Sequence, residues 1–248
     1  MKLERESVWS KSSTARKLIL LAVSAVAIIC LTACDGGKKN GAKNGDIDDA
    51  GEDTDVNVKK GVRPEADSQV AVIDTDYGKI VIELYPNIAP EMVKRYKQLI
   101  SEGFYNGTTF HRINPELGII QGGDPLSKDA DPKNDGSGNS PFPNVTAEFS
   151  DIPYDRSIVG AARMGGGMGM SEEQAKNTAN CQFFITLKRV PDFDKRYTIF
   201  GKVIEGIGNA DIIAGAPTDT GSERPAEKIV IKSVTLQPRS DFASSKAP

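Results

Sequence analysis

Two neighbouring segments, residues 70–75 and 79–85, have the residue pattern of β-strands and flank a short turn that ends at Gly78. In the second segment every other residue is strongly apolar (Ile80, Ile82 and Leu84). Alternation of this kind puts one face of a strand in the core, and a short turn that contains glycine joins two strands into a hairpin. The pattern therefore predicts a hairpin with one buried face.

A helix is predicted to follow this hairpin. Pro90 suits the first turn of a helix, apolar residues then recur at helical spacing, and Gly103 is placed to end it. Residues 206–214 predict a second, short helix, and further strands are predicted at residues 108–113, 118–122, 158–162, 181–187, 197–203 and 228–236. Many short strands with two helices favour a mostly β fold and a closed barrel, which leaves no exposed edge strand. Periodicity alone does not choose a barrel over a sandwich.

The N-terminal segment has the parts of a bacterial export signal. Residues 1–17 are rich in lysine and arginine, residues 18–31 are apolar apart from Ser24, and Leu31-Thr32-Ala33-Cys34 resembles a lipobox. The apolar run is shorter than the ~20 residues that a membrane-spanning helix needs. We expect residues 1–33 to be removed and Cys34 to carry lipid, which anchors the protein to the extracytoplasmic side of a bacterial membrane. An ordinary secretory signal with an incidental cysteine is the alternative.

Composition divides the rest of the chain. Residues 34–68 carry many charged side chains and no aromatic residue. Such a stretch cannot bury enough surface to offset the entropy of ordering, so a disordered linker is predicted there. Residues 69–238 are long enough for one domain with a substantial core, and residues 239–248 are expected to form a C-terminal tail.

The charge and the metal-binding residues exclude several classes of function. The net charge is only −3 and the chain has no basic stripe, so nucleic acid is not an expected partner. With Cys34 lipidated, the mature chain keeps one other cysteine, Cys181, and cannot form an intramolecular disulfide. Cys181 and His111, the only histidine, cannot supply the usual ligand set, so no metal site is predicted.

Three short blocks carry the strongest chemical signal. They are Phe110-His111-Arg112-Ile113, Gln121-Gly122-Gly123-Asp124 and Gln182-Phe183-Phe184-Ile185. Together they resemble the cyclophilin family of peptidyl-prolyl cis-trans isomerases. The resemblance implies a closed eight-stranded barrel capped by two α-helices, no cofactor, and a monomer that acts on proline-containing polypeptides. In an exported chain, these substrates are expected to be exported proteins.

The resemblance also assigns roles to individual residues. Arg112 matches the catalytic arginine, Gln121 the glutamine that orients it, and Phe184 the base of the proline pocket. The other substrate-binding positions that it implies are Phe110, His111, Ile119, Ala162, Gln182, Phe193 and Tyr197. We interpret His111 as a packing and hydrogen-bonding residue and not as an acid or base. Phe183 is interpreted as a core residue, because neighbours in a strand face opposite ways.

An arginine suits the chemistry of proline isomerisation. The barrier to rotation about an amide is ~18–20 kcal/mol, because the nitrogen lone pair is delocalised into the carbonyl. Arginine is always charged and presents several donors in a rigid fork, so it can donate to the nitrogen as the lone pair localises. Two other classes of function stay open: a proline-peptide binding module with little turnover, and an adhesin or other interaction protein that uses the barrel as a scaffold.

The pocket departs from the family pattern in two places. One extra residue separates Arg112 from Gln121, and Gly118, with Leu117 beside it, stands where an aromatic wall residue is usual. Asp192 replaces the tryptophan of many eukaryotic members, which predicts weak binding of cyclosporin.

Residues 164–180 are longer than their counterpart in the family and contain three methionines. A soft-metal site is one interpretation of the methionines, but we favour a flexible glycine loop with adaptable apolar side chains. Residues 171–174 have the spacing of a capping box, which predicts a short helix. The insertion is expected to border the substrate groove and to influence which residue is preferred before proline.

Overall fold

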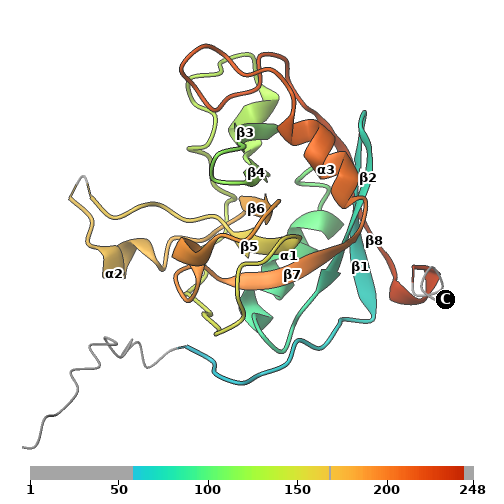
Figure 1. Ribbon diagram of the computed structural model, residues 1–248, viewed down its shortest axis with the longest axis vertical. Coiled ribbons are helices and arrows are strands. Elements are labelled where there is room, and N and C mark those ends of the chain that lie inside the picture. Colours follow the sequence, from blue (N-terminus) through green and yellow to red (C-terminus); the bar gives the residue numbers. More distant parts are fainter. Residues whose placement is uncertain (1–57, 168, 243–248) are drawn as a thin grey trace, which may run out of the picture. The chain divides into compact units, whose positions relative to one another are not determined.

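Eight strands form one curled sheet in the computed structural model, which describes residues 58–167 and 169–242 (Figure 1). The predictions for the export signal, for Cys34 and for residues 34–57 lie outside the described residues. The strands are β1 (Gln69–Thr75), β2 (Gly78–Leu84), β3 (Phe110–Asn114), β4 (Ile119–Gly122), β5 (Ile158–Ala161), β6 (Phe183–Thr186), β7 (Ile199–Glu205) and β8 (Ile231–Pro238). Their order across the sheet is β3-β4-β6-β5-β7-β2-β1-β8, and each neighbouring pair is antiparallel.

The two ends of the sheet meet through backbone hydrogen bonds beside β3 and β8. The Phe110 amide donates to the Ile229 carbonyl at 2.9 Å, and the Ile231 amide donates to the Thr108 carbonyl at 2.7 Å. Between them, Thr109 forms an isolated antiparallel bridge with Val230. The predicted mostly β, eight-stranded fold is therefore confirmed. Among the described residues, this short contact and not a long ladder closes the sheet.

Both predicted helices are present. In α1 (Pro90–Ser101), Pro90 occupies the first turn, and Gly103 follows the helix with a φ of +67°. The second predicted helix is α3 (Ile207–Ala214), and both helices contribute buried side chains to the central core. A third helix, α2 (Glu172–Ala175), is one turn long and begins with the predicted capping box between Ser171 and Gln174. Short 3-10 helices lie at η1 (Pro125–Lys128), η2 (Pro191–Phe193) and η3 (Arg239–Asp241).

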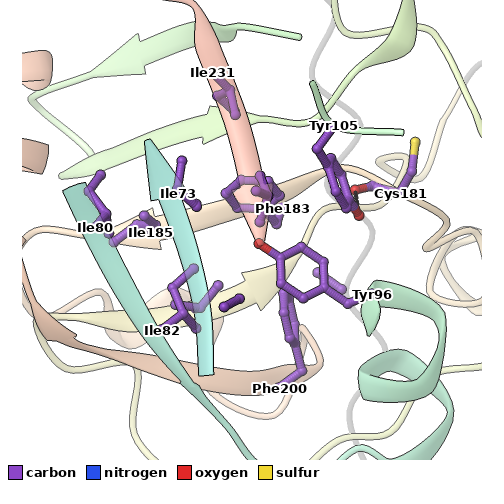
Figure 2. Packing of buried hydrophobic residues seen from close by; sticks show 14 of the residues in the cluster. Ile73, Ile80, Ile82, Tyr96, Tyr105, Cys181, Phe183, Ile185, Phe200 and Ile231 are labelled. Carbon is purple, nitrogen blue, oxygen red and sulfur yellow. Dashed lines mark hydrogen bonds between the residues drawn. The ribbon is translucent and has the colours of Figure 1, made fainter. Parts of the chain in front are cut away.

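The central core fills the inside of the barrel (Figure 2). The ring of Tyr96 from α1 lies 5.6 Å from that of Phe183 on β6 and 5.1 Å from that of Phe200 on β7. Ile80 and Ile82 of the hairpin are completely buried beside them. Because each such side chain contributes roughly 1.5–3 kcal/mol when it is buried, this cluster is the main source of stability of the domain.

The hairpin is covered on both faces, in contrast to the single buried face that its pattern predicts. Val81 on the outer face is only 2% exposed, and it packs with Val70 and Val72 of β1. Ile204 and Phe242 pack against these valines. Phe242 belongs to the predicted tail, so the apparent outer face is covered by a residue far along the chain.

The ordered part of the chain begins before the predicted domain boundary. Lys59 donates from Nζ to the Ile88 carbonyl at 2.8 Å, and its amide donates to the Phe149 carbonyl at 2.9 Å. Asp67 forms an ion pair with Lys97 of α1 at 2.9 Å. The prediction of a disordered linker is therefore wrong for residues 58–68. A low content of apolar residues predicts disorder, whereas this segment is held by backbone hydrogen bonds and by an ion pair.

No helix in the part of the chain that the structure describes is long and apolar enough to cross a bilayer.

Candidate active site

Arg112 and Gln121 are paired where β3 runs beside β4. Arg112 Nη1 donates to Gln121 Oε1 at 3.2 Å, and Arg112 Nε donates to the carboxylate of Glu223. Arg112 Nη2 donates no hydrogen bond to any residue that the structure describes. The guanidinium is thus held at two of its nitrogens and keeps donors on the third for a ligand.

A β-bulge sets the direction of the arginine. Phe110 pairs with Gly122 and Arg112 pairs with Gln121, so the register shifts between the two pairs. In a regular strand Phe110 and Arg112 would share a face, because they are two residues apart. The bulge separates them: Phe110 is completely buried in the central core, whereas the side chain of Arg112 is 39% exposed. Phe110 therefore does not share the outer face with Arg112, in contrast to the substrate contact that the resemblance implied.

His111 lies within the bulge, between the two paired residues Phe110 and Arg112. It lines a separate cavity of about 290 Å³ together with Pro132, Asp135 and Lys228. Burial lowers the pKa of His111, although the carboxylate of Asp124 acts in the opposite direction. The packing role predicted for His111 agrees with its 6% exposure, but neither ring nitrogen has a hydrogen-bond partner among the described residues. His111 lines this separate cavity and not the hollow beside Gln121 and Gln182, in contrast to the substrate contact that the resemblance implied.

Gln121 continues the hydrogen-bond chain to β6 and its flank. Its Nε2 donates to Gln182 Oε1 at 3.0 Å. Gln182 Nε2 in turn donates to the carbonyls of Gly136 and Gly138, at 3.0 and 2.9 Å. The side-chain amide of Gln182 therefore orients that of Gln121, and the side-chain oxygen of Gln121 is directed at Arg112. This arrangement supports the orienting role predicted for Gln121.

An aromatic cluster lies on the same face of the sheet as Gln121, because its member Phe184 on β6 is paired with Gln121 on β4. Phe184 is 2% exposed, and its ring centroid lies 5.3 Å from that of Phe193 and 5.6 Å from that of Tyr197. The ring of Tyr154 stacks against that of Phe184, with 5.7 Å between the ring centroids. Phe183, the next residue along β6, packs in the central core instead. Phe183 and Phe184 thus face opposite sides of the sheet, as predicted. Phe184, Phe193 and Tyr197 lie together in the aromatic cluster.

The wall of this cluster is aliphatic. Ile119 and Leu117 both pack in the aromatic cluster, Ile119 buried and Leu117 partly exposed. Gly118 has a φ of +80°, and a Cβ there would lie 2.4 Å from Lys188 Cγ. Gly118 therefore adopts a backbone conformation that favours glycine, and the neighbouring Leu117 supplies an aliphatic side chain to the wall.

A second hollow lies beside Gln121 and Gln182. It has a volume of about 300 Å³, and Ala162, Met164, Thr178 and Asn180 contribute to its lining. Ala162 also packs against the aromatic cluster that contains Phe184. The structure therefore brings Ala162 and Gln182 together between the aromatic cluster and this hollow. Met164 at the start of the insertion, and Thr178 and Asn180 towards its end, form part of the wall of this hollow.

Comparison with known proteins agrees with this geometry. Residues 70–236 match the family model for cyclophilin-type peptidyl-prolyl cis-trans isomerases. The chain belongs to the cyclophilin family. It is 36% identical over 158 residues to a probable peptidyl-prolyl cis-trans isomerase of Brucella suis, a match that covers 62% of this chain and 76% of the relative.

Two further similarities extend to other organisms. The chain is 36% identical over 178 residues to the peptidyl-prolyl cis-trans isomerase-like 2 of Gibberella zeae, covering 71% of this chain but only 28% of that longer protein. A crystal structure of a Cryptosporidium parvum cyclophilin, determined in the presence of the dipeptide Ala-Pro, matches with 30% identity and a TM-score of 0.57. That match covers 68% of this chain and 98% of the other. This cyclophilin is accordingly a peptidyl-prolyl cis-trans isomerase.

Two charged residues of this cyclophilin site were not predicted from the sequence. Glu223 reaches Arg112 from the segment between α3 and β8. Arg163 lies over the ring of Tyr197, with its Cζ 4.5 Å from the ring centroid, and pairs with Glu172 of α2 at 2.5 Å. The position of Arg163, directly after Ala162, could have indicated its place in the groove. No sequence signal connects Glu223 with an arginine more than 100 residues earlier.

Cys181, the only cysteine in the described part of this cyclophilin, is unsuited to nucleophilic chemistry. It is completely buried, and burial raises the pKa of its thiol to about 12. A thiolate is the reactive form, so Cys181 stays inert near neutral pH. Within residues 58–167 and 169–242, no group of three or more histidine, cysteine, aspartate or glutamate side chains could hold a metal ion.

Proposed function

We propose that this cyclophilin accelerates X-Pro rotation through Arg112, which donates a hydrogen bond to the amide nitrogen as the peptide twists. The observation that carries the proposal is the position of Arg112. Its guanidinium is held by Gln121 and Glu223, and Nη2 is left with donors for a ligand. Such a donor acts most strongly on the twisted amide, because only there is the nitrogen lone pair localised. Preferential stabilisation of the twisted state lowers the barrier and is the origin of catalysis.

The aromatic cluster supplies the grip that this mechanism needs. Phe184 forms the base for a proline ring, Phe193 and Tyr197 form the rim, and Ile119 with Leu117 forms an aliphatic wall. A proline ring is apolar and compact, so it gains from burial in such a pocket. A related cyclophilin was crystallised in the presence of Ala-Pro, which supports a proline-containing peptide as the ligand of this site.

The residues before the proline are assigned to the polar side of the site. Gln121 can accept from or donate to the peptide backbone, and Ala162 leaves room beside Gln182 for the chain to pass. The hollow that Met164 and Thr178 help to line then receives the side chain before the proline. This assignment gives the insertion a role in peptide preference.

We further propose that the enzyme works as a lipid-anchored monomer on exported proteins. The export signal and the lipobox at Cys34 support this location, and uncatalysed proline isomerisation is slow enough to limit the folding of such substrates. The Cys34→Ser variant is expected to leave the membrane fraction of the bacterial host and to incorporate no labelled fatty acid. Unchanged labelling of that variant would exclude Cys34 as the anchor.

A proline-peptide binding module is the second candidate, favoured by the lack of an aromatic wall residue at Gly118, beside which Leu117 packs against the cluster. The two functions are separated by measuring cis–trans exchange of an Ala-Pro peptide by NMR in the presence of the purified full-length chain. The proposed enzyme accelerates exchange at catalytic concentrations. Binding of the peptide without any acceleration would favour the module.

A further inference from the structure

Glu223 contacts three consecutive residues of β3. Its carboxylate accepts hydrogen bonds from Arg112 Nε and from Asn114 Nδ2, and its carbonyl accepts from the Ile113 amide at 2.6 Å. One residue therefore binds the backbone and both outward-facing polar side chains of this stretch. Such a set of contacts fixes the position of the carboxylate relative to the arginine.

The segment that carries Glu223 is itself internally held. The Asp219 amide donates to the Arg224 carbonyl at 2.9 Å, and the Ala226 amide donates to the Pro217 carbonyl at 2.9 Å. The side chain of Arg224 closes the same loop by donating from Nε to Asp219 Oδ2 at 2.7 Å. Residues 217–226 thus form a compact loop that presents Glu223 to β3 without needing a ligand to order it.

We propose that Glu223 is a positioning residue for the isomerase reaction, acting by fixing the plane of the Arg112 guanidinium; this inference rests on the proposed function of Arg112. A long arginine side chain loses considerable rotamer freedom when it is ordered. Glu223 at Nε and Gln121 at Nη1 order it before the substrate arrives. The donors of Nη2 are then aimed at one place, and the substrate does not bear the ordering cost.

Glu223 could act on Arg112 in two ways, through its negative charge or through the hydrogen bond that it accepts. A carboxylate lowers the positive potential of its arginine, whereas a hydrogen-bond acceptor of any charge fixes the direction of Nε. Positioning therefore predicts that Glu223→Gln, which keeps an amide oxygen, stays within about 3-fold of the parent kcat/KM. Glu223→Ala, which removes the acceptor, is expected to lose about 10-fold, the effect of one charged hydrogen bond.

Asp211 provides a matched control. It pairs with Arg156 on the protein surface, where the side chains are 45% and 44% exposed, close to the 42% and 39% of Glu223 and Arg112. Asp211→Ala removes a carboxylate from a similarly exposed arginine, but Asp211 belongs to α3 and does not line the hollow beside Gln121. It is expected to keep the parent kcat/KM, so any loss in Glu223→Ala exceeds the general effect of breaking a surface pair.

The test measures kcat/KM of full-length variants on an X-Pro peptide, in the parent chain and in an Arg112→Lys background. Positioning through Arg112 predicts a loss of about 10-fold for Glu223→Ala in the parent and less than about 2-fold in the lysine background. The NMR signal of Arg112 Nε–H should be protected from exchange in the parent and lose protection in Glu223→Ala. Parent activity in Glu223→Ala, an equal loss in both backgrounds, or an equal loss in Glu223→Gln would overturn the proposal. If the parent chain itself does not accelerate exchange, the proposed function fails instead.

Discussion

Gly160 of β5 and Phe184 of β6 face each other across the sheet, and the Phe184 ring occupies the space that a side chain at residue 160 would need. A Cβ on Gly160 would lie 2.4 Å from Phe184 Cζ and 2.7 Å from the hydroxyl of Tyr154. The absence of a side chain on β5 is therefore what allows the base of the candidate proline pocket to lie flat against the barrel.

Replacing Gly160 with alanine should therefore displace Phe184. The ring cannot move far, because Phe193, Tyr197 and Tyr154 contact it. We expect Gly160→Ala to cost about 1–3 kcal/mol of unfolding free energy, as overpacking does, and to lower kcat/KM on an X-Pro peptide. Denaturant unfolding and the isomerase assay check the two effects. Parent-like values for both would show that Phe184 is not held in this position.

Gln121 is expected to matter for activity far more than for stability. Gln121→Leu removes the bond to Arg112 and the bond to Gln182, but the side chain is only half-buried and its packing volume is largely retained. A hydrogen bond to a charged group is worth about 1.5–3 kcal/mol, so kcat/KM should fall by at least about 10-fold. The melting temperature, measured by circular dichroism, should change little. A large fall in melting temperature with intact activity would reverse this interpretation.

The insertion is expected to set the preference for the residue before proline. Met164 and Asn180, at its two ends, line the hollow beside Gln182. Arg163 also lines this hollow and pairs with Glu172 of α2. Deletion of residues 165–170 should change the ratio of kcat/KM values across a series of peptides that differ only before the proline. Isomerase assays on that series provide the measurement. An unchanged ranking of the peptides would remove the insertion from the groove.

Cyclosporin is expected to bind weakly, because Asp192 stands where many eukaryotic members have a tryptophan with an indole donor. Asp192 is exposed at the rim formed by η2, beside Phe193. Inhibition of the isomerase by cyclosporin should require micromolar concentrations or more, and Asp192→Trp should strengthen it. A nanomolar inhibition constant for the parent chain would contradict this account.

The pKa of His111, the only histidine, tests whether its imidazole ring is buried. Burial lowers the pKa of His111 below its usual 6.5, so its single imidazole signal in an NMR titration should have a midpoint below that value. Because the unfolded state then binds the proton more readily, His111 contributes stability above about pH 6.5 that is lost as the pH falls through the folded pKa. His111→Gln should remove this part of the pH dependence of unfolding. A midpoint at or above 6.5 would contradict the buried position.

The sequence predicted those features that depend on local patterns. The alternation of apolar residues placed Ile80 and Ile82 in the core. Because neighbours in a strand face opposite ways, the sequence also placed Phe183 and Phe184 on different faces. It did not predict the bulge that turns Phe110 inward, because nothing in the alternation of β3 marks an extra residue. The sequence also did not predict the contact of Glu223 with Arg112 or the packing of Phe242 over Val81. Both contacts join residues that are distant along the chain.

The central claim, that Arg112 carries the isomerase activity, is tested most directly by comparing Arg112→Ala with Arg156→Ala. Both arginines pair with a carboxylate and have similar exposure, 39% and 44%, but Arg112 is the one that is hydrogen-bonded to Gln121. Measured as kcat/KM on an Ala-Pro peptide, Arg112→Ala should lose at least about 100-fold while Arg156→Ala stays at the parent value. Equal activity of Arg112→Ala and the parent would contradict the account.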